Sequence, residues 1–170
     1  MGRWLTVSVI AMSLAACSVI DKSTPKNSAP GTSEMSTQAE DGVTVFATTY
    51  FADLPDTAPL ILLFHQGGSN ARAEYAPLIP WFHENGFRVI AWDLRVGGDI
   101  YGRTNRTADA MLPEEATSYC DGYADMQAAL KASLPRTPAG EVIIWGSSYS
   151  GALVFHLAAD NPETVSGVVS

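Results

Sequence analysis

The chain has 170 residues, of which 46% are hydrophobic and 16% are charged, a composition typical of about one globular domain. Its formal net charge of −8 at pH 7 argues against nucleic acid as a partner, because the sequence has no basic patch that would neutralise phosphates. The three histidines lack ligand spacing with one another, so the sequence does not indicate a metal site.

The N-terminus has the features of a secretory signal peptide. Arg3 supplies a positive charge, and residues 4–16 form an apolar stretch that is too short to remain as a membrane-spanning helix. Residues 14–17, Leu-Ala-Ala-Cys, resemble the bacterial lipoprotein signal, which implies cleavage after residue 16 and acylation of Cys17. The resemblance implies an exported protein of the bacterial cell envelope that is anchored to a membrane through Cys17. The alternative is an ordinary cleaved signal with an incidental cysteine.

Residues 17–41 are predicted to be a flexible tether between this lipid anchor and a domain at 42–170. The segment is rich in Ser, Thr, Pro, Asn and Gln and has too few large apolar residues to offset the entropy of ordering. If Cys17 is acylated, Cys120 has no cysteine left with which to form an internal disulfide. Its place in a predicted amphipathic helix favours a small, buried, apolar role.

The domain alternates predicted strands with predicted helices. Strands are expected at 43–50, 60–64, 87–92, 141–145 and 164–169, and helices at 74–84, 113–134 and 149–160. In the helix at 113–134, Tyr119, Tyr123, Met126 and Leu130 share one face, which is typical of core packing. Apolar strands that alternate with helices predict an α/β fold, with a mostly parallel sheet and helices on both of its faces.

Residues 146–151, Gly-Ser-Ser-Tyr-Ser-Gly, lie between a predicted strand and a predicted helix. A serine in such a tight turn has a strained backbone, and the residues two positions away must be small because strand and helix approach closely. The segment resembles the Gly-x-Ser-x-Gly elbow of the α/β-hydrolase family, with Gly146 and Ser148 in place, Ser150 at the second glycine and Gly151 one step later. The resemblance implies that Ser148 is the nucleophile, with Ser147 as the alternative.

The loop after the strand at 60–64 carries the second part of the resemblance. Residues 65–68, His-Gln-Gly-Gly, match the family's oxyanion loop, and residues 65–75 are similar to the dienelactone-hydrolase-like branch. In this family, one backbone N–H of this loop and the N–H after the nucleophile stabilise the developing oxyanion. The resemblance spans roughly residues 43–170 and implies Gly67, or alternatively Gln66, together with Tyr149 as oxyanion-hole residues.

Asp93 has two interpretations, because it follows the predicted strand at 87–92. It could be a triad acid, but the family usually has an aspartate here that shapes a turn, and the structural role is the favoured one. The polar loop at 95–110 is predicted either to line the substrate mouth or to be an ordinary solvated loop.

The triad partners of Ser148 are missing from the sequence. In the family's chain order, the acid and the histidine both follow the serine. His156 lies only eight residues later, about 12 Å along the same predicted helix, and Asp160 and Glu163 lie at its far end. His65 and His83 come earlier in the chain and are not plausible bases. The sequence therefore predicts an inactive or incomplete fragment of a serine hydrolase, with a small-molecule acyl substrate and no cofactor.

Two other classes of function remain open. A non-catalytic α/β-fold lipoprotein with a binding role would explain the missing triad residues. A nucleotide-binding module is suggested by Gly67 and Gly68 after one strand and Asp93 after the next. However, the Gly-x-Gly-x-x-Gly fingerprint is incomplete, and this alternative leaves the serine elbow unexplained.

Overall fold

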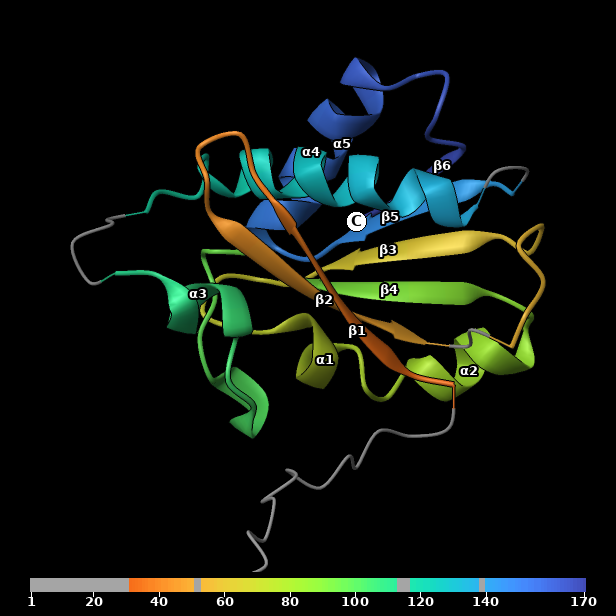
Figure 1. Ribbon diagram of the computed structural model, residues 1–170, viewed down its shortest axis with the longest axis horizontal. Helices are drawn as coiled ribbons and strands as arrows, with labels where there is room; N and C mark the ends of the chain where they lie inside the picture. Colours follow the sequence, from red (N-terminus) through yellow and green to blue (C-terminus); the bar gives the residue numbers. More distant parts are fainter. Residues whose placement is uncertain (1–30, 51–52, 113–116, 138–139) are drawn as a thin grey trace, which may run out of the picture.

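The computed structural model describes residues 31–50, 53–112, 117–137 and 140–170, which form one six-stranded sheet with the strand order β1-β2-β4-β3-β5-β6. Neighbouring strands are parallel from β4 through β3 and β5 to β6, whereas β1 and β2 are antiparallel at one edge (Figure 1). The predicted α/β fold with a mostly parallel sheet is confirmed. The strands are β1 (Ser33–Gln38), β2 (Thr44–Tyr50), β3 (Leu60–Phe64), β4 (Arg88–Asp93), β5 (Val142–Gly146) and β6 (Gly167–Val169).

Helices cover both faces of the sheet, with α4 and α5 in the upper half of Figure 1 and α1 and α2 in the lower half. Alternate residues of β3 serve the two faces. Leu62 and Phe64 belong to a core cluster with residues of α4 and α5, and Leu63 belongs to a cluster with residues of α1 and α2. The helices are α1 (Ala71–Glu74), α2 (Ile79–Glu84), α3 (Arg106–Ala110), α4 (Gly122–Ser133) and α5 (Tyr149–Asp160), with short 3₁₀ helices η1 (Ile100–Gly102) and η2 (Leu134–Arg136).

The prediction of a flexible tether up to residue 41 is wrong for β1. All six residues of Ser33–Gln38 pair with β2, and Met35 packs against the core. β1 is an edge strand, so most of its side chains can face solvent, and its polar composition is compatible with strand pairing. The predicted signal peptide, Cys17 and the rest of the tether up to residue 30 lie outside the described residues.

The single helix predicted at 74–84 is two helices, α1 and α2. Two prolines explain the break, because proline has no N–H to donate within a helix. Pro77 lies between the helices, and Pro80 occupies the first turn of α2, where the missing N–H costs nothing. Gly86 ends this region with φ +75°, the left-handed conformation expected from the sequence.

The helix predicted at 113–134 begins only at Gly122, so two inferences that depended on its first turns are wrong. Cys120 is exposed rather than buried, and Tyr119 is 61% exposed rather than part of the core. Both residues lie in a turn before α4, while Met126 and Leu130 are buried as predicted. Residues 113–116 lie outside the described part of the chain.

The described residues include no helix of sufficient length and apolarity to cross a membrane.

Candidate active site

Ser148 lies in the sharp turn between β5 and α5, at the carboxyl edge of the parallel strands. Its backbone has φ 58° and ψ −118°, a conformation that non-glycine residues rarely adopt. The turn leaves Ser148 exposed, whereas Ser147 before it is only partly exposed. A strained, exposed serine between a strand and a helix has the geometry of a nucleophile elbow, and the strain favours Ser148 over Ser147.

The elbow requires very close contact between β5 and the first turn of α5. A Cβ on residue 146 would lie 2.5 Å from the carbonyl carbon of Ser150 and 2.7 Å from the amide nitrogen of Gly151. A Cβ on residue 151 would likewise lie 2.8 Å from the hydroxyl of Ser170, with the backbone of Gly146 as the next neighbour. Glycine at 146 and a small residue at 151 therefore allow strand and helix to meet.

Ser150, which stands where the motif has a glycine, has a structural role of its own. Its side chain is fully buried, and its hydroxyl accepts a hydrogen bond from the N–H of Ser147 at 2.8 Å. The same hydroxyl donates to the carbonyl of Phe64, at 2.8 Å, at the end of β3. The substitution thus ties the elbow to the strand that leads into the oxyanion loop.

The oxyanion loop follows β3, and its neighbours distinguish the two candidate donors. The N–H of Gln66 points to the carboxylate of Glu74, with distances of 3.1 and 3.3 Å to its two oxygens. Within the described part of the chain, the N–H of Gly67 donates to no backbone or side-chain acceptor. Tyr149 is the first residue of α5, so its N–H has no acceptor within the helix. Among the described residues, the amides of Gly67 and Tyr149 thus have no hydrogen-bond acceptor, which makes them the candidate donors.

His65 is a buried structural residue. The N–H of Leu94 donates to its Nε2 at 2.8 Å, so Nδ1 carries the proton and donates to the carbonyl of Gln66 at 2.6 Å. Asn105 Nδ2 also lies 2.9 Å from Nε2. Burial lowers the pKa of the imidazole below its ordinary value of 6.5. His65 therefore fixes the oxyanion loop against β4 as a neutral ring and has no nitrogen left for catalysis.

The buried state of His65 predicts a loss of stability in acid. The unfolded chain takes up a proton near pH 6.5 and the folded state does so only at lower pH, so the stabilisation is complete above pH 6.5 and is lost as the pH falls below it. Below pH 6.5, we expect His65→Gln to reduce the slope of the free energy of unfolding against pH, by at most about 1.4 kcal/mol per pH unit for one proton, measured by urea titration between pH 5 and 7. His156→Gln, on the exposed surface of α5, should keep the slope. Equal slopes for His65→Gln and the parent chain would contradict this assignment.

Asp93 is placed as a structural residue, in agreement with the favoured interpretation. Its side chain is fully buried, and its carboxylate accepts hydrogen bonds from the N–H of Ala71 at 3.2 Å and from Nε of Arg106 at 2.8 Å. Thr107 also donates to its carbonyl. Asp93 therefore holds α1 and α3 at the end of β4, on the far side of β3 from the elbow.

Among the described residues, none is placed to act as a base for Ser148. His83 lies on α2, with Nε2 4.0 Å from the carboxylate of Asp53, and His156 is exposed two turns along α5. Asp160 accepts a hydrogen bond from the hydroxyl of Tyr123 at the other end of α5. The described chain also contains no group of three or more His, Cys, Asp or Glu side chains that could hold a metal ion.

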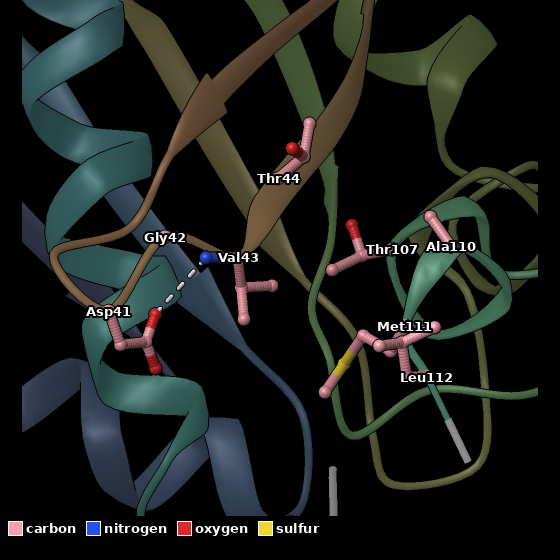
Figure 2. Close-up of a pocket in the computed structure, with 8 residues that line it drawn as sticks. All are labelled: Asp41, Gly42, Val43, Thr44, Thr107, Ala110, Met111 and Leu112. Carbon is pink, nitrogen blue, oxygen red and sulfur yellow. Dashed lines mark hydrogen bonds between the residues drawn. The ribbon is translucent and has the colours of Figure 1, made fainter. Parts of the chain in front are cut away.

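A pocket of about 230 Å³ lies between the β1–β2 turn and α3 (Figure 2). It is at the same edge of the sheet as Ser148, but β4 and β3 separate β2 from β5, which corresponds to roughly 14 Å. Two of its polar side chains already have partners within the protein. Asp41 forms an ion pair with Arg95, and the Thr107 hydroxyl lies 2.5 Å from the carbonyl of Asp93. The charge of Asp41 is therefore already paired with that of Arg95.

Comparison with known families and structures agrees with the fold. Residues 59–170 match a family model described as the alpha/beta hydrolase fold. No curated protein matches the sequence.

Several solved structures share the fold. An esterase from Pyrococcus furiosus is 18% identical with a TM-score of 0.62, over 81% of this chain and 48% of its own. A carboxyl esterase from Bacillus coagulans, solved with glycerol, is 22% identical with a TM-score of 0.62, over 81% and 43%. A dienelactone hydrolase from Anabaena variabilis is 17% identical with a TM-score of 0.59, over 81% and 62%. The chain thus spans about half the length of the esterases it resembles.

Proposed function

The chain belongs to the α/β-hydrolase family, and on that premise we propose that it supplies the nucleophile and the oxyanion hole of a serine hydrolase for ester, lactone or related acyl bonds. The strained backbone of Ser148 is the observation that carries the proposal. Its hydroxyl would attack the acyl carbon to give an acyl-enzyme, while the amides of Gly67 and Tyr149 stabilise the oxyanion. The esterases and the dienelactone hydrolase of similar fold support an acyl substrate.

The mechanism also needs a base that takes the proton of Ser148 and an acid that orients this base. Since no described histidine is placed for this work, the proposal assigns both groups to sequence outside these 170 residues. The first test is to translate the DNA that follows codon 170 in all frames. We expect an Asp or Glu followed by a His, each at the end of a further strand pattern.

Labelling with a fluorophosphonate probe tests the nucleophile directly. We expect the protein that includes the additional acid and histidine to be labelled at Ser148, with the labelled peptide identified by mass spectrometry, and the 170-residue chain to remain unlabelled because nothing activates its serine. Ser148→Ala should abolish labelling. Ser147→Ala is the matched control, because it removes the neighbouring hydroxyl and should leave labelling intact.

Two outcomes would contradict the proposal. Loss of labelling in Ser147→Ala but not in Ser148→Ala would transfer the role of nucleophile to Ser147. The absence of downstream acid and histidine codons, together with no labelling of any form, would favour the non-catalytic binding role.

The nucleotide-binding alternative is disfavoured, because both carboxylate oxygens of the buried Asp93 already bind the chain itself and cannot reach a ribose.

We also propose that the protein is exported and anchored to a membrane of the bacterial envelope through an acyl chain on Cys17. The support is the lipoprotein-like sequence at 14–17. Expression in bacteria with labelled palmitate is expected to label the parent protein and not Cys17→Ser. Equal labelling of both forms would contradict the anchor.

A further inference from the structure

Two exposed tyrosines contact the oxyanion loop. Gln66 Nε2 donates to the hydroxyl of Tyr101 at 3.3 Å. The ring of Tyr119 lies against the Cα of Gly67, because a Cβ on residue 67 would lie 2.9 Å from its Cε1 and 3.1 Å from its hydroxyl oxygen. Both tyrosines are more than half exposed, 62% for Tyr101 and 61% for Tyr119. Exposed aromatic surface beside a candidate nucleophile is typical of a ligand-binding surface.

Tyr119 also touches the second oxyanion-hole residue. Its ring stacks on the ring of Tyr149, with centroids 4.9 Å apart and an interplanar angle of 23°. One face of Tyr119 is therefore occupied by Tyr149, and its edge lies against Gly67. The remaining exposed surface of the ring borders the place where a substrate carbonyl would enter between these two backbone amides.

Tyr101, the second tyrosine at the loop, has an unusual backbone. Its φ of 68° and ψ of 17° place it in the left-handed region inside η1. For a bulky residue this conformation costs free energy, and such strain is concentrated at functional sites. Ile100 beside it also contacts the loop, with its Cδ1 3.2 Å from the position of a Cβ on Gly68. The oxyanion loop is thus bordered by apolar surface from η1 and from the turn before α4.

We propose that Tyr119 is a specificity-determining residue that binds a flat, apolar group of the acyl substrate, such as an aromatic or conjugated acyl chain. This inference rests on the proposed function of Ser148. A flat group can stack on the free surface of the Tyr119 ring while its carbonyl reaches Gly67 and Tyr149. A saturated ring of the same size is puckered and cannot stack in this way.

The test uses the protein that includes the complete triad and a matched pair of substrates, methyl benzoate and methyl cyclohexanecarboxylate. We expect Tyr119→Leu to raise KM for methyl benzoate about three- to tenfold, as expected for the loss of one stacking contact, with kcat little changed. KM for the cyclohexane ester should change less than twofold. Tyr119→Phe keeps the ring, so its KM for methyl benzoate should be close to that of the parent protein. Trp81→Leu, which changes an exposed aromatic residue on α2, should leave both esters unaffected.

The outcomes separate this inference from the function on which it rests. Hydrolysis of both esters by Tyr119→Leu with an unchanged preference would overturn the role of Tyr119 and leave the hydrolase intact. A loss of kcat for both esters in Tyr119→Phe would show a structural role instead. No hydrolysis by the parent protein, together with no labelling of Ser148, would overturn the hydrolase and this inference with it.

Discussion

Asp125→Ala is expected to lower the free energy of unfolding by about 3 kcal/mol, because it leaves a buried arginine without its main partner. Arg95 is only 6% exposed, and its side chain donates to Asp125 from Nε at 3.0 Å and from Nη2 at 2.7 Å. The carboxylate also accepts the backbone N–H of Arg95 at 2.7 Å. The value lies at the lower end of the range for broken buried pairs, because Asp41 still contacts the guanidinium. Urea unfolding followed by circular dichroism measures the difference.

Asp41→Ala is the matched control, since it removes the other carboxylate from the same guanidinium. Asp41 is 44% exposed at its side chain, so its ion pair is screened by water and should contribute about 1 kcal/mol or less. Arg95→Met combined with Asp125→Leu removes both buried charges and should recover much of the stability lost in Asp125→Ala. A cost for Asp41→Ala equal to that of Asp125→Ala would contradict the dominant role of the buried pair.

The sequence predicts the central part of the fold well because its signals there are local. The apolar run of β3 and the boundaries of α5 can be recognised from the residues themselves, and both are confirmed. The edge strand β1 could not be recognised, because its stability comes from pairing with β2 rather than from its own polar residues. Apolar periodicity alone does not predict where a helix starts when prolines, or a turn such as 119–121, interrupt the pattern.

The candidate site likewise combines features that the sequence predicts with features that only the structure shows. Ser148 and the oxyanion loop are predicted from short motifs with fixed spacing, which the sequence alone contains. The place of Tyr119 beside Gly67 depends on a contact between segments more than 50 residues apart, and helical periodicity assigned this residue to the core instead. The preference for Gly67 over Gln66 also required the structure, since the N–H of Gln66 already donates to the carboxylate of Glu74.

Gly146→Ala is expected to disrupt the elbow more than the small size of the added methyl group suggests. The added methyl group would lie 2.5 Å from the carbonyl carbon of Ser150 and 2.7 Å from the amide nitrogen of Gly151, and both are backbone atoms that no side-chain rotation can move. Strand β5 and helix α5 must therefore separate, which we expect to cost about 2–3 kcal/mol of unfolding free energy. The same shift would move Ser148 and the amide of Tyr149 away from Gly67, so fluorophosphonate labelling of the protein with the complete triad should be lost.

Gly167→Ala is a suitable control, because it places the same methyl group on the neighbouring strand β6. Its nearest contact there would be the side chain of Ile143 at 3.6 Å, an ordinary van der Waals distance. Stability and labelling should both stay close to those of the parent protein. If Gly146→Ala retained full labelling of Ser148, the close approach of β5 and α5 would not be what holds the nucleophile in its strained conformation, and the elbow would need another source of rigidity, such as the hydrogen bond from the Ser150 hydroxyl to the carbonyl of Phe64.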